Sequence, residues 1–353
     1  MKNVHSTPHQ DLNTDNVQGV SGGEQDNEEA VSLGDLDELT GLIDRWSFDD
    51  CWPFVVDLRD RCRAALSRGK QLWPAAAYAE YRLALDAPPV FAAAVLGSSA
   101  ERFTLGPFAE VMASTHRFSA LRDYLPQSPE AGMVAHECAL RGEEFGQIDV
   151  PFADVLSIPL KLADWEPDYQ LAEYQPSKAA FSSPPVPLAF DTISVLGQRN
   201  PKVIDDAETV RCLRDLVGAW VSGSNGRVDT IAVRGTAADA VATLGCSQHR
   251  RARIEPDEAM AHMAWAGASG GAQGRRRGAA SGRASAWWAL QHLAGFDGQD
   301  NIEPDELGQA ASELCWYWWD DGSPATGWAL RLAIEDPAEG LAWAVAASDI
   351  KMA

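Results

Sequence analysis

Residues 36–66, LDELTGLIDRWSFDDCWPFVVDLRDRCRAAL, set the pattern for the first third of this 353-residue chain. Apolar residues recur there at steps of three and four, first in Leu36, Leu39, Ile43 and Trp46, then in Val55, Leu58, Cys62 and Leu66. This spacing places apolar side chains on one face of a helix. Similar stretches continue to about Glu143, separated by Gly, Ser and Pro breaks that are typical of helix ends. The pattern predicts short antiparallel helices over residues 32–145.

Two segments lack this periodicity. Residues 1–31 are polar and poor in apolar side chains, so they are predicted to form a disordered tail. Residues 146–203 are rich in proline but also contain apolar side chains such as Trp165, Tyr169 and Tyr174. Because such side chains favour burial, this segment is predicted to be a looped connection that wraps the helices.

Residues 204–353 are predicted to form a second helical region. It contains most of the chain's 13 tryptophans. Residues 228–233 are the best strand candidate, Thr236 and Asp239 fit a capping box, and Pro256 and Pro304 each stand where a helix begins. A stripe of apolar residues predicts one helix through the tryptophan cluster (Leu307, Ala311, Leu314, Cys315 and Trp318), and residues 336–339 predict the start of a last helix.

These segments together predict a mainly α-helical fold. The expected architecture is a helix-hairpin array or an α-solenoid-like bundle, with a proline-rich connection and at most a few short strands. In this fold Trp316, Trp318 and Trp319 face different sides of one helix, because successive residues are about 100° apart. Packing in the core is therefore favoured over ligand binding for these three rings.

Charge and composition exclude some functional classes. The net charge of −22 disfavours sequence-independent binding to nucleic acid, which depends on neutralising phosphates. No apolar run is long enough to span a membrane, and the first 20 residues do not resemble a signal peptide, so a cytoplasmic location is expected. The six cysteines form no CxxC pair, which argues against a metal site or a redox motif.

No recognisable catalytic, metal-binding or cofactor-binding motif is present. His136 and Glu137 begin a zinc-protease-like pattern, but residue 140 is Leu where a second His ligand is needed. These residues are therefore assigned to an ordinary helix surface, on which Glu137, Arg141 and Glu144 exchange charges. The chain also lacks a GxSxG elbow and a phosphate-binding GxxxxGK[ST] loop.

Residues 270–283, GGAQGRRRGAASGR, form the one loop with a pattern suited to an anion. Glycines let backbone amides approach a ligand, a helix N-terminus adds positive potential, and arginines bind phosphate or carboxylate. The candidate anion-binding residues are Arg275, Arg276, Arg277 and Arg283, and the candidate stacking residues are Trp287 and Trp288. In the alternative interpretation, the arginines pair with the chain's own carboxylates, such as Asp320, Asp321, Glu335 and Asp336. Internal ion pairing is favoured over ligand binding by about two to one.

Five stretches of the chain form a recognisable set: GRRRGAASGRASAWWAL (274–290), CWYWWDDG (315–322), GWALRLAIEDPAEGLAWAVAASD (327–349), AHECALRGE (135–143) and LADWEPDYQLAEY (162–174). They resemble an uncharacterised bacterial family of the actinomycete type, defined only as a domain of unknown function. The resemblance covers most of the chain after the tail. It implies no catalytic residues.

The sequence favours a non-catalytic cytoplasmic protein that binds or scaffolds a protein partner, because helix-hairpin arrays present concave binding surfaces. It predicts no cofactor, no nucleic acid and no membrane as partner. The second hypothesis is an enzyme or small-molecule-binding protein that holds an anionic ligand with the loop at residues 270–283.

Overall fold

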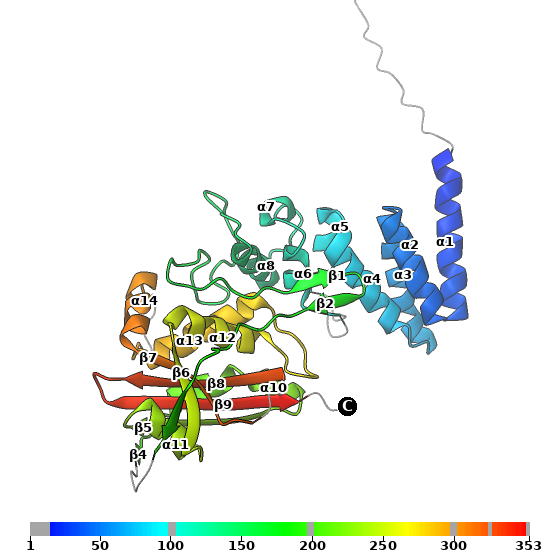
Figure 1. Cartoon of the computed structure of the whole chain (residues 1–353). Helices are drawn as coiled ribbons and strands as arrows, with labels where there is room; N and C mark the ends of the chain where they lie inside the picture. Colours follow the sequence, from blue (N-terminus) through cyan, green and yellow to red (C-terminus); the bar gives the residue numbers. More distant parts are fainter. Residues whose placement is uncertain (1–14, 98–103, 196–200, 297–301, 324–326, 351–353) are drawn as a thin grey trace, which may run out of the picture.

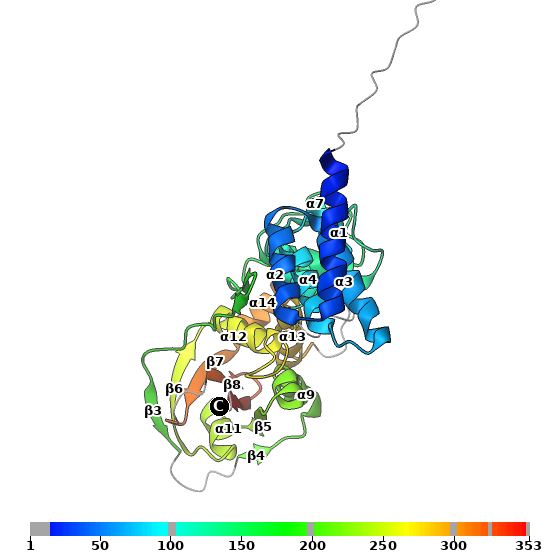
Figure 2. The same ribbon diagram turned by 90° about the vertical axis from the view of Figure 1, so that its right-hand side faces the viewer.

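The computed structural model describes residues 15–97, 104–195, 201–296, 302–323 and 327–350. Two bodies follow one another along the chain, and they lie one above the other in Figures 1 and 2. We call them the N-terminal helical body (residues 15–140) and the C-terminal sheet body (residues 191–350). Residues 141–190 connect them.

The N-terminal helical body contains eight α-helices and one short 3-10 helix within its described residues. These are α1 (Asp15–Leu33), α2 (Leu36–Phe48), α3 (Trp52–Ala65), η1 (Leu66–Arg68), α4 (Trp73–Asp86), α5 (Pro89–Ala93), α6 (Phe108–Ala113), α7 (Phe118–Leu121) and α8 (Pro129–Leu140). Their boundaries follow the chemistry of helix ends. Asp35 accepts hydrogen bonds from the backbone of Asp37 and Glu38, and prolines stand in the first turns of α3 and α4. The helices predicted for this region are confirmed.

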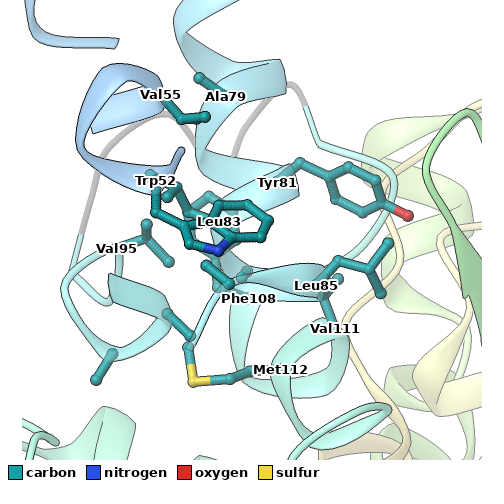
Figure 3. Close-up of a cluster of buried hydrophobic side chains, with 14 of the residues drawn as sticks. Trp52, Val55, Ala79, Tyr81, Leu83, Leu85, Val95, Phe108, Val111 and Met112 are labelled. Atoms are coloured by element: carbon teal, nitrogen blue, oxygen red, sulfur yellow. The ribbon is translucent and has the colours of Figure 1, made fainter. Parts of the chain in front are cut away.

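The core of this body lies around α4, in which ten of the 14 residues are buried. Figure 3 shows Trp52 of α3, Tyr81 and Leu83 of α4, and Phe108 and Met112 of α6 among the side chains of this cluster. Each of these side chains is at most 4% exposed. Burial of so many apolar side chains stabilises the body as a single unit.

The disordered tail predicted for residues 1–31 is wrong for residues 15–31, which belong to α1. Residues 1–14 lie outside the described part of the chain. The helix is held by a few tertiary contacts: Ala30 and Val31 are buried, and Asn27 donates to the Phe54 carbonyl and accepts from the Trp46 indole. Composition alone gave no sign of these contacts.

The connection contains a two-stranded hairpin, β1 (Glu173–Gln175) and β2 (Lys178–Ala180), and is otherwise irregular. It contacts both bodies. Tyr81 donates to the Gln175 carbonyl at 2.6 Å, and the Trp165 indole donates to the Pro304 carbonyl at 2.7 Å.

The C-terminal sheet body is built on a seven-stranded antiparallel sheet with the order β3-β6-β7-β8-β9-β5-β4. The strands are β3 (Asp191–Ser194), β4 (Lys202–Val203), β5 (Arg227–Arg234), β6 (Gln248–Ile254), β7 (Cys315–Asp320), β8 (Gly327–Asp336) and β9 (Leu341–Ile350). The predicted mainly α-helical fold is therefore wrong, since helices and a large sheet share the structure. The strand predicted at residues 228–233 is confirmed within β5.

The tryptophan cluster caused this error. The helix predicted through it ends at Glu313, and Trp316, Trp318 and Trp319 lie on β7 instead. Trp316 and Trp318 face one side of the sheet and Trp319 faces the other, as strand geometry requires. Because both faces are buried, the strand has a continuous apolar run that periodicity cannot distinguish from a buried helix.

The helix predicted from Asp336 is also wrong, because the chain turns there from β8 to β9. Asp336 Oδ1 accepts hydrogen bonds from the backbone N–H groups of Ala338 and Glu339 at 2.9 and 3.1 Å, as the N-cap residue of a helix does. Gly340 then adopts a φ of 63° and the chain reverses.

The described residues of this body form six helices: α9 (Ala207–Asp215), α10 (Gly218–Gly223), α11 (Ala237–Thr243), α12 (Pro256–Ala268), α13 (Ala279–Leu293) and α14 (Pro304–Glu313). Thr236 and Asp239 form the predicted capping box, and the predicted helix starts at Pro256 and Pro304 are confirmed. α11 covers one face of the sheet. On the other face α12 and α13 lie between the sheet and the N-terminal helical body (Figures 1 and 2).

Candidate functional site

The arginine-rich loop joins α12 to α13, the two helices between the bodies. Two hydrogen bonds from its backbone amides hold this loop in place. Ala272 N–H donates to the buried Asp349 carboxylate at 2.6 Å, and Arg277 N–H donates to the Ala268 carbonyl at 2.7 Å. A Cβ on Gly270 would lie 2.3 Å from the backbone of Arg275, so this turn requires glycine. The loop therefore presents its arginines from a fixed backbone.

Arg276 points into the contact between the two bodies. Its Nε and Nη2 donate to the Glu110 carboxylate of α6 at 2.8 and 2.7 Å, and the Tyr174 hydroxyl donates to the same carboxylate at 2.7 Å. The side chains of Arg276 and Glu110 are 6% and 0% exposed. Although burial alone would raise the pKa of Glu110, the Arg276 charge and these hydrogen bonds hold it below its ordinary value.

The N-terminus of α13 is capped by two glutamates of the N-terminal helical body. Glu110 Oε1 accepts from Ala279 N–H at 3.1 Å, and Glu137 Oε1 of α8 accepts from Ala280 N–H at 2.8 Å. Glu137 Oε2 also accepts from Arg141 at 2.8 Å. Burial and the neighbouring Glu110 carboxylate raise the pKa of Glu137 to about 7. The amides of Ala279 and Ala280, expected to attract a ligand, are thus bound by the protein's own carboxylates.

Arg283 makes a second buried ion pair, with Glu166 of the connection. Its Nε and Nη2 donate to Glu166 at 2.6 and 2.7 Å, and the two side chains are 1% and 0% exposed. The Trp287 indole and the Tyr169 hydroxyl donate to the same carboxylate at 2.9 and 2.6 Å. The backbone N–H of Ala163 is a fifth donor to this carboxylate. The five hydrogen bonds compensate for the burial of the Glu166 charge.

Two of the four candidate arginines and one of the two candidate tryptophans thus lie in buried hydrogen-bond networks: Arg276, Arg283 and Trp287. Their carboxylate partners differ from those suggested by the sequence. Asp320 and Asp321 pair with Arg250 and Arg331, Glu335 accepts from Ala237 N–H, and Asp336 forms a turn.

The roles of Glu110, Glu137 and Glu166 were not predicted from the sequence. Glu137 does pair with Arg141 as predicted, but it is 1% exposed rather than on a helix surface. Glu110 and Glu137 stand in largely apolar stretches, such as AEVMA for Glu110, which is consistent with burial, whereas Glu166 stands in DWEPD and has no such signal.

The remaining candidates lie on the surface. Arg275 and Arg277 are exposed, and within the described residues no carboxylate forms an ion pair with either side chain. Trp288 is 51% exposed and lines the same cavity as the Cys212 side chain of α9. The three residues are brought to one side of the molecule by α13 and the loop before it.

They border two adjoining cavities, which we call the α13 groove. The first, of about 320 Å³, is lined by all three loop arginines together with Thr104, Gly106, Pro107 and Ser281. The second, also about 320 Å³, lies between α13, α9 and residues 156–158, and is lined by Arg277, Ser281, Ser285 and Trp288. Because Arg277 and Ser281 line both cavities, the two lie side by side, and the second holds Arg277 and Trp288 together.

The described residues do not favour a metal site, a reactive thiol or a membrane-spanning helix. No group of three or more His, Cys, Asp or Glu side chains there is arranged to hold a metal ion. Burial raises the pKa of the Cys62 and Cys138 thiols to about 12, which makes both poor nucleophiles. In this part of the chain no helix combines the length and the apolar character needed to cross a bilayer.

The model of a protein family of unknown function, DUF6183, matches residues 37–351. The chain belongs to this family. The match covers the N-terminal helical body after α1, the connection and the C-terminal sheet body, so the α13 groove lies wholly within the shared region. No curated protein and no solved structure matches the chain.

Proposed function

We propose that this DUF6183 protein binds a small anionic molecule in the α13 groove. Arg277 and Trp288 line the same cavity, which is the main support for this assignment. A guanidinium binds phosphate or carboxylate, and an exposed indole stacks on an aromatic or apolar group. The ligand class is therefore an anion that carries a ring.

The charge of the chain supports this assignment. In a protein of net charge −22, most of the surface repels anions, so two neighbouring exposed arginines without a carboxylate partner form a local positive site. Arg275 and Arg277 remain unpaired within the described residues even though Arg276 between them is buried against Glu110. The only acid that lines the groove in the described chain is Asp215, at its wall with α9. A doubly charged phosphate group matches two such arginines.

The groove also limits the size of the ligand. Ser281 and Trp288 are seven residues apart on α13, which corresponds to about 10 Å along the helix axis. Ser281, Ser285 and Trp288 share one face of the helix, since they follow steps of four and three. A nucleotide or an aromatic phosphate has its anion and its ring at a suitable separation.

The scaffold function expected from the sequence rested on a helix-hairpin array, and the large sheet removes that basis. The proposal keeps a binding role and a cytoplasmic location. The six cysteines support the location, because all are free thiols, as is usual in a reducing compartment. A protein partner stays a prediction, as does the lack of nucleic-acid binding.

Thermal unfolding and tryptophan fluorescence of the full chain, titrated with pyrophosphate, nucleoside monophosphates and sugar phosphates, test the proposal. A ligand that binds only the folded chain raises its melting temperature. We expect stabilisation by at least one nucleotide, and loss of that effect in the Arg275→Ala, Arg277→Ala double variant. Trp288→Leu should weaken binding of the nucleotide but not of pyrophosphate.

Arg211→Ala is the matched control, because Arg211 is an exposed arginine on neighbouring α9 that does not line the groove. It should leave every titration unchanged. A chain that is not stabilised by any of these anions, or an Arg275/Arg277 variant that binds as tightly as the control, would contradict the proposal.

A further inference from the structure

The central sheet opens at one end, between β7 and β8. β7 and β8 pair only as far as Trp318 opposite Leu332. β7 nevertheless continues to Asp320 beside β6, and β8 begins at Gly327 beside β9. The two strands therefore diverge at one end. The backbone edge of β8 from Gly327 to Arg331 that faces β7 has no strand partner among the described residues.

A cavity of about 290 Å³ lies at this opening and is separate from the α13 groove. Its walls include Trp318 of β7, His262 and Trp265 of α12, and Phe190 of the segment before β3. The volume equals that of about ten water molecules, which suits a ligand of one or two fused rings. Aromatic walls with a few polar groups are typical of small-molecule sites.

His262 provides a directed polar atom in this wall. Its side chain is 3% exposed, and its ring lies on the Trp318 indole with centroids 4.3 Å apart. Burial lowers the pKa of His262 to about 4, so the imidazole is neutral near pH 7. The Pro185 carbonyl lies near the ring and can only accept, so it favours the tautomer whose N–H faces it and whose other nitrogen is an acceptor.

The charges at the rim of the cavity are already balanced. Asp320 accepts from Arg250 at 2.5 Å, and Arg331 donates to Asp321 at 2.5 Å. An additional charge on a ligand would compete with these pairs. The site therefore favours an uncharged ring, with polar groups on its edge for His262 and for the unpaired edge of β8.

We propose that this cavity binds a neutral nitrogen heterocycle of the nucleobase type, which donates a hydrogen bond to His262 and contacts Trp265 and Phe190 with its faces. The proposal does not depend on the α13 groove. Adenine is a suitable probe because its edge has both donors and acceptors, and naphthalene is a ring of similar size without them.

Equilibrium dialysis of the full chain against each probe measures binding. We expect saturable binding of adenine. His262→Phe keeps a ring against Trp318 but removes the acceptor, so it should weaken adenine binding by about 5- to 10-fold and leave naphthalene binding unchanged. His249→Phe is the matched control, because His249 is equally buried and lies near Trp319 but does not line the cavity.

A second variant covers the case in which His262→Phe fails to fold. Ala329 of β8 lines the cavity and is only partly buried, so Ala329→Phe should fill the space and abolish binding of both probes. The proposal is overturned if adenine does not bind saturably. It is overturned equally if adenine binds His262→Phe as tightly as the control, or still binds Ala329→Phe.

Discussion

Arg276 and Glu110 are 166 residues apart in the chain, yet they share two hydrogen bonds of 2.7 and 2.8 Å inside the contact between the two bodies. Their neighbours in the sequence have a different environment, since Arg275 and Arg277 on either side of Arg276 are exposed. The same loop therefore fastens the two bodies together with one arginine and presents two others to the α13 groove.

This arrangement predicts opposite results for adjacent arginines. Arg276→Ala leaves the buried Glu110 carboxylate without its cation, so it should lower the free energy of unfolding by about 3–5 kcal/mol. Arg277→Ala removes an exposed side chain and should change it by less than about 0.5 kcal/mol. Urea unfolding of the two variants measures the difference. Equal losses would show that Arg276 has no special role in stability.

Glu137 should make stability depend on pH. Its ordinary pKa is 4.5 and rises to about 7 in the folded chain. Between these values the folded chain keeps a proton that the unfolded chain releases, so the Glu137 contribution to stability is present below pH 4.5 and is lost as the pH rises through 7. The loss amounts to at most about 3 kcal/mol.

Buried histidines have the opposite effect on the pH dependence of stability. The pH dependence of wild type alone therefore does not measure the contribution of Glu137. The pKa of His262, for example, falls from 6.5 to about 4, and its contribution therefore increases with pH over that range. The test compares urea unfolding of wild type with Glu137→Gln from pH 4.5 to 7.5. The stability of wild type relative to the variant should fall as the pH rises. A constant difference would contradict the prediction.

The ion pair between Arg283 and Glu166 should not be replaceable by apolar residues. Many buried pairs are, because a well-packed apolar substitute avoids the cost of burying two charges. Glu166, however, also accepts from Trp287, Tyr169 and the backbone of Ala163. In an Arg283→Met, Glu166→Leu double variant these donors lose their acceptor, at about 1–3 kcal/mol each.

We therefore expect the double variant to be several kcal/mol less stable than wild type in thermal and urea unfolding. Arg82→Met with Asp86→Leu is a suitable comparison, because this i,i+4 pair lies within α4 and Asp86 is 32% exposed. Its loss should be smaller. A double variant at positions 283 and 166 as stable as wild type would mean that the extra donors contribute little.

Local sequence signals predicted the helix ends and the strand within β5, but they failed where burial extends to both faces of an element. The cap chemistry at Pro256, Thr236 and Pro304 depends on a few adjacent residues, so it is visible in the sequence. Trp318 and Trp319 belong to a strand because of the neighbouring strands, which come from distant parts of the chain. No local pattern contains that information.

The candidate site shows the same limit. The sequence identified the arginines and tryptophans around α13, but it did not separate Arg276, Arg283 and Trp287, which are buried, from Arg277 and Trp288, which border the groove. That division is decided by Glu110 and Glu166, which are more than 100 residues away along the chain.

The close approach of α12 and α13 predicts the effect of two glycine substitutions. A Cβ on Gly282 of α13 would lie 2.1 Å from the Ala264 carbonyl oxygen of α12, so Gly282→Ala forces the helices apart. Gly41 lies in α2 with no atom within 4 Å of its Cβ position. Gly41→Ala should therefore stabilise the chain by about 0.5–1 kcal/mol, since alanine favours helix.

Gly282→Ala should instead destabilise the chain by about 1–3 kcal/mol, in spite of the same gain in helix propensity, because overpacking moves the backbone. It also shifts the α13 face that carries Ser285 and Trp288, so a ligand of the α13 groove should bind more weakly. Urea unfolding and ligand titration of both variants measure these effects. If Gly282→Ala proved as stabilising as Gly41→Ala, the two helices would not pack as closely as the structure shows.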